Sequence, residues 1–317
     1  MANLGHLLRR LRAGSMRPAA WGSREASPPP ITDREEFWEQ ASGFTPAMLV
    51  EREGLRYFVS TTDRTVGRWV FLKGYYSKSQ LDSVGSALTH LGLLERTGEQ
   101  TVLNVGANIG TIAVPLVKHF GFAHGVACEP EPANFDLLRL NILANGLEDR
   151  IAAVRAAVGT SDSEVPFGVL EDSSGKHMVI RDDRLRSKFT DQEGRRILTV
   201  PGATLDGLLA KRQIDPDAVG LVWVDTQGHE AHVLRGASQL LDRPVPMVIE
   251  FHPGMLGDTL PDLQDLIMEH FTHVLDVRSL NGRDDPQFEP VDRVPELVDA
   301  YQQRRRGAFT DLLLLNL

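Results

Sequence analysis

The sequence has one cysteine, Cys128, no long apolar run and no excess of positive charge. A single thiol excludes a fold held by disulfides within the chain. A transmembrane helix needs about 18 or more consecutive apolar residues, and no stretch approaches that length. The formal net charge of −9 gives no support for a nucleic-acid partner held by general electrostatics. We therefore expect a cytoplasmic globular protein of 317 residues, with one large domain or two small ones.

The chain is organised around residues 101–111, TVLNVGANIGT. The apolar residues 102–103 predict a short strand, and Gly106 and Gly110 predict a tight turn. Residues 112–120 then predict a helix. This order is typical of the first strand, turn and helix of a nucleotide-binding α/β unit.

A second short apolar run, residues 125–128, ends on Glu129. Nucleotide-binding units place an acid on a ribose at about this spacing, roughly 20 residues after the turn. A dinucleotide fingerprint also needs glycine at three positions, which are Gly106, Asn108 and Thr111 here. Because Asn108 and Thr111 carry a Cβ, the pattern disfavours a nicotinamide or flavin dinucleotide.

S-adenosylmethionine, which has no pyrophosphate, fits this pattern better. It requires a close backbone approach at Gly106 and Gly110, and amide groups at the helix start to meet its carboxylate. Glu129 would accept hydrogen bonds from the two ribose hydroxyls. The alternative is a plain strand-to-helix turn in which Glu129 is a solvated strand end.

We expect three segments in the chain. Residues 1–31 form a flexible or amphipathic extension, which either touches an anionic membrane surface through residues 1–14 or docks on the domain. Residues 32–95 form an N-terminal platform or lid, in which residues 68–72 have an extended pattern. Residues 96–317 form the main domain.

The aromatic residues Trp69, Tyr75 and Tyr76 of the platform suggest either a sugar-stacking surface or part of its core, and the core is our preferred interpretation.

The main domain continues as alternating strands and helices. Residues 161–200 have no helical period and predict an inserted β hairpin or meander. Ala157 falls in the loop beyond the third strand, where an adenine would lie. Further strands are predicted at residues 151–154, 220–224, 245–251, 273–277 and 309–315.

Two strand ends carry acid and imidazole groups. Asp225 follows the apolar strand 220–224, and His229 and Glu230 begin the next helix. Glu250 and His252 stand at the end of the following strand. Ligands of open parallel sheets bind outside such carboxyl ends, so these groups are expected near one crevice.

The ordered blocks NVGANIG, CEPEPANFDLLRLNILANG, TLDGLL, VDTQGHEAHVLRGA and IEFHP resemble the FkbM family of S-adenosylmethionine-dependent methyltransferases. The resemblance covers roughly residues 70–315. It implies a Rossmann-like class I methyltransferase sheet of seven mostly parallel strands, with an antiparallel last strand beside the sixth. It also implies that Gly106, Asn108 and Gly110 cradle the cofactor and that Glu129 holds its ribose.

The same resemblance places Asp225 and Glu230 in the acidic block after the fourth strand. Two positions depart from the family pattern. Asn104 stands where aspartate is common, although its amide oxygen can still accept from the methionine amine. Gln227 stands where glutamate is common, and an amide cannot serve as a base.

The predicted reaction is O-methylation of a sugar, glycan or natural-product hydroxyl. An alcohol needs a general base, and our candidates are His252 and His229, with Asp225 as orienter or direct base. Asp225, Glu230 and His252 also suit a divalent cation, but no ligand spacing is diagnostic and we expect no metal. Two other functions remain open: a non-catalytic methyltransferase-like binding module, and an NAD(P)-dependent oxidoreductase.

Overall fold

The computed structural model describes residues 33–187, 189, 194–280, 286–304 and 308–317. The extension predicted for residues 1–31 lies outside this part of the chain. Within the described residues, no helix combines the length and the apolar character that crossing a membrane requires.

The middle layer is an eight-stranded sheet. Its strands are β3 (Thr101–Val105), β4 (His124–Cys128), β5 (Ile151–Val154), β11 (Val219–Val224), β12 (Met247–Phe251), β13 (His273–Asp276), β14 (Glu289–Pro290) and β15 (Thr310–Leu315). They follow the order β14-β13-β15-β12-β11-β3-β4-β5. The strands from β12 to β5 are parallel to one another, and β15 is antiparallel to both β12 and β13. This confirms the expected class I sheet with its inserted antiparallel strand, to which the short β14 is added.

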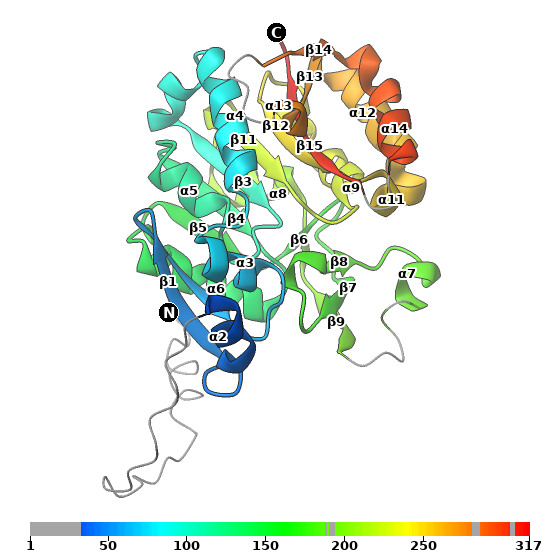
Figure 1. Ribbon diagram of the computed structural model, residues 1–317. Coiled ribbons are helices and arrows are strands. Elements are labelled where there is room, and N and C mark those ends of the chain that lie inside the picture. Colours follow the sequence, from blue (N-terminus) through cyan, green and yellow to red (C-terminus); the bar gives the residue numbers. More distant parts are fainter. Residues whose placement is uncertain (1–32, 188, 190–193, 281–285, 305–307) are drawn as a thin grey trace, which may run out of the picture.

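Helices cover both faces of the sheet (Figure 1). Because side chains alternate along a strand, Val102 and Trp223 enter one core while Leu103 and Val222 enter the other. The first core includes residues of α4 (Lys78–His90), α5 (Ala113–Lys118), α6 (Pro132–Ala144) and α13 (Val277–Leu280). The second includes residues of α8 (Leu205–Arg212), α9 (Glu230–Arg235), α10 (Ser238–Leu241), α11 (Pro253–Leu256), α12 (Leu260–His270) and α14 (Val294–Gln303).

Residues 33–99, here called the N-terminal block, share the first of these cores. Besides α4, the block contains α2 (Arg34–Ala41), the antiparallel hairpin β1 (Ala47–Arg52) and β2 (Leu55–Ser60), and α3 (Val66–Lys73). Asn141 of α6 accepts from the Phe58 amide at 2.6 Å and donates to the Phe58 carbonyl at 3.2 Å. The hairpin is therefore fastened to the sheet-covering helix α6. The division into a platform at residues 32–95 and a main domain stays a prediction.

The prediction of an extended segment at residues 68–72 is wrong, because these residues lie in α3. The run is rich in β-branched and aromatic side chains, which favour strands locally. Val66 and Val70 are one helical turn apart and both are buried, so packing against the core selects the helix. Gly74 ends the helix with a left-handed φ of 90° and donates to the Val70 carbonyl.

The predicted insertion is a three-stranded antiparallel sheet of β7 (Val165–Leu170), β8 (Met178–Val179) and β9 (Arg195–Val200). A short helix that the sequence did not predict, α7 (Asp183–Ser187), lies between β8 and β9. At the base of the insertion, β6 (Ala157–Val158) pairs in parallel with β10 (Gly202–Ala203).

Candidate functional site

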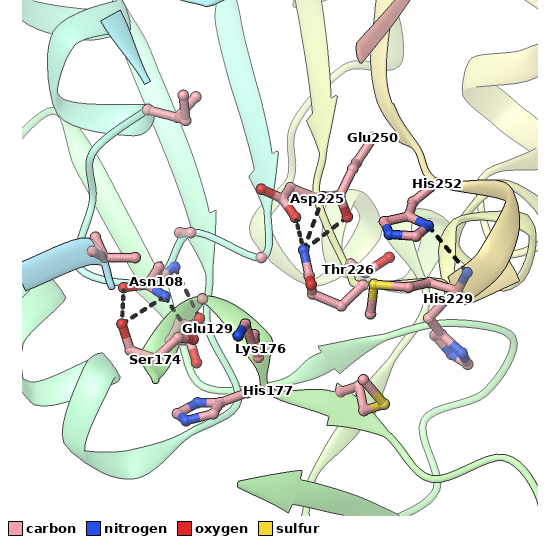
Figure 2. Close-up of a pocket in the computed structure, with 18 of the residues that line it drawn as sticks. Asn108, Glu129, Ser174, Lys176, His177, Asp225, Thr226, His229, Glu250 and His252 are labelled. Carbon is pink, nitrogen blue, oxygen red and sulfur yellow. Dashed lines mark hydrogen bonds between the residues drawn. The ribbon is translucent and has the colours of Figure 1, made fainter. Parts of the chain in front are cut away.

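A cavity of about 790 Å³ lies at the carboxyl ends of β3, β4, β11 and β12. Its wall comes from the turn after β3, the β insertion, the N-terminal block and the start of β15. In Figure 2, Asn108, Glu129, Ser174, Lys176 and His177 gather on one side. Asp225, Thr226, His229, Glu250 and His252 gather on the other. Most of the predicted site residues thus share one cavity with two chemically different sides.

The turn after β3 requires glycine at Gly106, which has a left-handed φ of 82°. A Cβ there would overlap the carbonyl oxygen of Asp225. The amides of Gly106 and Ala107 donate to the Cys128 carbonyl at 3.0 and 2.8 Å, which binds the turn to the end of β4. At Gly110, a Cβ would lie 3.0 Å from Leu138 of α6. The two glycines therefore let the strand ends and the helix approach one another closely.

Glu129 joins this turn to the end of β4. It accepts from the Asn108 amide and from the Glu131 amide, each at 2.9 Å. Burial raises the pKa of Glu129 to about 8, against the opposing effect of these two hydrogen bonds. Its side chain lines the cavity, and so does Ala157 on β6. The cofactor contacts expected of both residues stay predictions.

Asn104 lies outside the set of residues that line the cavity. Only 1% of the residue is exposed, and its Nδ2 donates a long hydrogen bond of 3.5 Å to the Trp223 carbonyl. Its Oδ1 is buried and has no hydrogen-bond partner among the described residues. The geometry therefore gives no direct support for the contact predicted between Asn104 and a methionine amine.

Three carboxyl groups lie at the ends of β11 and β12 and the start of β15: the partly exposed Asp225 and the buried Glu250 and Asp311. Gln227 donates from Nε2 to Asp225 at 3.0 Å and to the two oxygens of Glu250 at 3.0 and 2.8 Å. Asp311 stands opposite Glu250 in the β12–β15 register. Gln227 is thus the residue that holds the Asp225 and Glu250 side chains together.

Burial governs the titration of this group. Burial raises the pKa of Asp225. Burial and the neighbouring charges of Asp225 and Glu230 raise the pKa of Glu250 well above its ordinary value. The hydrogen bond that Asp225 accepts from Gln227 opposes the effect of burial on its pKa. Burial also raises the pKa of Asp311 to about 8. The sequence did not reveal Asp311, because its partner Glu250 is brought opposite to it only by the pairing of β12 with β15.

Glu230 is buried at the start of α9 and closes the turn before it. Its Oε1 accepts from the Thr226 amide and hydroxyl, both at 3.0 Å, and from the Gly228 amide at 3.1 Å. It lies outside the set of cavity-lining residues. Its position favours a structural role over the catalytic one predicted.

The two candidate histidines both line the cavity but differ in their surroundings. His229 stacks on His232 with ring centroids 4.3 Å apart, and burial lowers its pKa to about 3. Its Nε2 would lie 2.8 Å from a Cβ at position 159, so Gly159 makes room for the ring. His229 is therefore a neutral and weakly basic group at pH 7.

His252 accepts at Nδ1 from the Met255 amide, at 3.2 Å. Since Nδ1 is the acceptor, the neutral ring carries its proton on Nε2. The ring lies parallel to Phe309 at a centroid distance of 6.1 Å. While this hydrogen bond holds, His252 offers the cavity a donor and not the base that the sequence predicted.

A hydrogen-bonded chain that the sequence did not reveal connects the N-terminal block to the turn. Ser174 of the insertion donates from its hydroxyl to Asp63 at 2.6 Å, and its carbonyl accepts from Asn108 at 3.0 Å. Asp63 is buried and also accepts from the amides of Thr65 and Gly67. Asn108 itself has a left-handed φ of 49°.

The preference for a core position of Trp69, Tyr75 and Tyr76 is wrong. Their exposed fractions are 47%, 40% and 40%. Trp69 and Tyr76 line the large cavity, and Tyr75 lines a smaller adjoining one of about 340 Å³.

Among the residues described, no group of three or more His, Cys, Asp or Glu side chains has an arrangement that could hold a metal ion.

Among curated proteins, the hexuronic acid methyltransferase AglP of Haloferax volcanii is 28% identical over 165 residues, which are 51% of this chain and 61% of the relative. The chain thus spans about three fifths of the length of that relative.

Two solved structures are among those that this chain matches. A methyltransferase FkbM from Methylobacillus flagellatus is 16% identical, with 68% of this chain and 44% of that chain covered and a TM-score of 0.39. TYW2 of M. jannaschii in complex with AdoMet is 10% identical, with 86% and 87% covered and a TM-score of 0.38.

The profile of the Methyltransferase FkbM domain matches residues 104–278. This range is more than half of the chain and contains both the turn at Gly106 and the acids after β11. The chain therefore belongs to the family of FkbM-domain methyltransferases.

Proposed function

We propose that this chain transfers a methyl group from S-adenosylmethionine to a hydroxyl oxygen of a sugar. The observation that carries the proposal is the single cavity, which combines a glycine turn and buried acid on one side with a carboxyl pair on the other. An acceptor and a cofactor that meet in one cavity satisfy the first requirement of group transfer, which is proximity.

The residues of the turn fit S-adenosylmethionine. Gly106 and Gly110 both have left-handed φ values, and a Cβ at Gly106 would fill the space between the ends of β3 and β11. Glu129 lines the cavity beside them, at the end of β4, where it is suited to accept from ribose hydroxyls. Ala157 lines the cavity near the expected adenine position.

When bound, S-adenosylmethionine supplies a methyl group that its positively charged sulfur already activates. The chain's own residues must hold the acceptor hydroxyl and take its proton, and a positioned base contributes about 10² to 10⁴ in rate. Asp225 is our candidate base, because burial makes its carboxylate more basic than an exposed one. Gln227 holds that carboxylate in place through its Nε2, and His252 offers Nε2–H to the oxygen of the acceptor.

The sugar acceptor rests on the one curated relative, whose name gives hexuronic acid as its substrate. Such an acceptor presents several hydroxyls and a carboxylate on one small ring. Arg278 lines the same cavity and stacks over Phe309 at 5.1 Å, so a guanidinium is placed where it suits an acidic sugar.

The test begins with calorimetric titration of the purified protein with S-adenosylhomocysteine, beside NAD as a control. We expect micromolar binding of the first alone. Methyl transfer is then measured with S-adenosylmethionine and a panel of methyl glycosides that includes methyl glucuronides.

Asp225→Asn should lower turnover at least about 100-fold and leave the affinity for S-adenosylhomocysteine within about threefold. The exposed Asp242→Asn is the matched control and should change neither quantity. Binding of NAD instead would overturn the proposal, and full activity of Asp225→Asn would exclude Asp225 as the base. Binding of S-adenosylhomocysteine without turnover on any acceptor would favour the binding module.

A further inference from the structure

We propose that the N-terminal block supplies an aromatic platform, formed by Trp69 and Tyr76, on which the pyranose ring of the acceptor stacks. The inference rests on the proposed function and extends it by assigning an acceptor subsite. Both residues precede the segment 104–278 that matches the family profile. Acceptor choice would then be set by a part of the chain outside that segment.

Exposure singles out these two residues. The large hydrophobic side chains exposed in the described part of the chain are Phe44, Leu49, Trp69, Tyr75, Tyr76, Leu143, Met268 and Leu317. Of this set, only Trp69 and Tyr76 line the large cavity. An aromatic surface left open inside a cavity is expected where a ligand completes the packing.

The fold holds Trp69 in this position. It lies on α3, whose Val66 and Val70 are buried against the core. The Trp69 amide donates to the Thr65 carbonyl at 3.0 Å, which keeps it within the helix, and the ammonium of Lys73 lies 6.0 Å from its ring. The burial of Val66 and Val70 therefore anchors the helix that carries Trp69 at the edge of the cavity.

Tyr76 is held between α3 and α4 and faces the insertion. Its hydroxyl would lie 3.4 Å from a Cβ at Gly175, so the insertion approaches the ring closely at a residue without a side chain. Although 40% of the residue is exposed, desolvation of its hydroxyl and then the charges of Asp225 and Glu250 raise the pKa of Tyr76 to about 12. Tyr76 thus keeps its proton at neutral pH and lies within electrostatic range of the carboxyl pair.

The neighbours of the platform suit a carbohydrate. Ser77, Ser79 and Gln80 line the same cavity and come from the same segment as Tyr76. Aromatic faces pack against the C–H face of a pyranose, while hydroxyl and amide groups bond its hydroxyls. A ring seated on the platform would lie in the same cavity as Asp225, which would take the proton of the hydroxyl that is methylated.

The experiment measures sugar binding without turnover. Methyl α- and β-pyranosides, including methyl glucuronides, are titrated into the full chain saturated with S-adenosylhomocysteine, with intrinsic fluorescence and calorimetry as readouts. We expect millimolar or tighter binding of at least one pyranoside. Trp69→Ala and Tyr76→Ala should each weaken it about three- to tenfold, the range of one aromatic contact.

Tyr75→Ala is the matched control, because Tyr75 has the same exposed fraction of 40% as its neighbour but lines only the smaller cavity. It should leave pyranoside affinity within about twofold. Tyr76→Phe keeps the ring and should retain most of the affinity. Thermal unfolding of each variant shows whether it is folded.

Binding of no pyranoside by the wild-type chain would overturn the platform, and so would equal affinities for the wild type and both alanine variants. Weaker binding of S-adenosylhomocysteine with unchanged sugar affinity would assign the aromatic pair to the cofactor instead. Failure of the proposed function looks different: the wild-type chain would then bind sugars, but not S-adenosylhomocysteine.

Discussion

Gly106 lies where the end of β3 closely approaches the end of β11, at the carbonyl of Asp225. Its left-handed φ of 82° and the overlap of any Cβ with the Asp225 carbonyl are two separate reasons for glycine. Gly54, in the β1–β2 turn, has a similar φ of 74° but no atom within 4 Å of a built Cβ. A pair of variants can therefore separate the two reasons.

Gly54→Ala should cost only the backbone strain, about 1 kcal/mol in free energy of unfolding. Gly106→Ala should cost about 2 kcal/mol more, because the Asp225 carbonyl must move, and it should weaken S-adenosylhomocysteine binding at least about tenfold. Urea unfolding and calorimetry check both variants. Equal losses in the free energy of unfolding of the two variants would show that the close approach to Asp225 adds nothing to the cost of a Cβ at Gly106.

The residues that the sequence predicted correctly are those whose type is tied to local geometry. Gly106 was found because a tight turn between a strand and a helix favours glycine, and its left-handed φ of 82° agrees with this. Asp311 and Ser174 escaped prediction because their partners are brought to them by strand pairing and by the insertion. The local sequence around either residue contains no pattern that indicates these long-range contacts.

The insertion, the N-terminal block and the turn after β3 are joined through Ser174. Its hydroxyl reaches Asp63, and its carbonyl accepts from Asn108, whose amide in turn donates to Glu129. Three elements that are distant in sequence therefore share one hydrogen-bonded chain that ends at a predicted cofactor residue.

Ser174→Ala removes only the hydroxyl and leaves a buried Asp63 oxygen with one donor fewer. We expect a loss of about 1 kcal/mol in free energy of unfolding and a severalfold weaker binding of S-adenosylhomocysteine. Thr62→Ala, an exposed hydroxyl in the same turn region, is the control and should change neither. Unchanged cofactor affinity in a destabilised Ser174→Ala would show that the chain supports the fold alone.

Elements with a clear period were predicted well, since the order of strands and helices from β3 to β15 follows from hydrophobic periodicity. The segment at α3 was not, because its local strand preference is overridden by the burial of Val66 and Val70. The two-residue strand β14 and the short helices α7 and α13 are below the length at which periodicity is informative.

The whole molecule has a formal net charge of −9, which counts every carboxyl group as ionised. Burial raises the pKa values of Glu129 and Asp311 to about 8 and raises those of Asp225, Glu230 and Glu250. At pH 7 the native protein therefore retains protons that the unfolded chain has lost. Its actual charge is less negative than the formal value.

This proton difference predicts how stability depends on pH. From pH 6.5 to 8.5 the carboxyls of the unfolded chain are ionised, while the native Glu129 and Asp311 still release protons. Since the native state binds more protons, its free energy of unfolding falls as pH rises, by about 2 kcal/mol for each of these two groups across this window. Below pH 6.5, His177, His229 and His252 contribute in the opposite direction. Their pKa values are lower in the native protein than in the unfolded chain, so their contribution to stability is lost as pH falls.

Asp311→Asn isolates one of these groups. The variant should be more stable than the wild type by about 1 kcal/mol or more at pH 8.5, with a smaller advantage at pH 6.5, because asparagine has no charge to bury. Urea unfolding at four pH values between 6.5 and 8.5 measures the slopes, with the exposed Asp299→Asn on α14 as the control that should run parallel to the wild type. Two results would contradict this prediction: a wild-type stability that rises with pH, or an Asp311→Asn slope equal to that of the wild type. Either result would show that the native Asp311 is already ionised between pH 6.5 and 8.5.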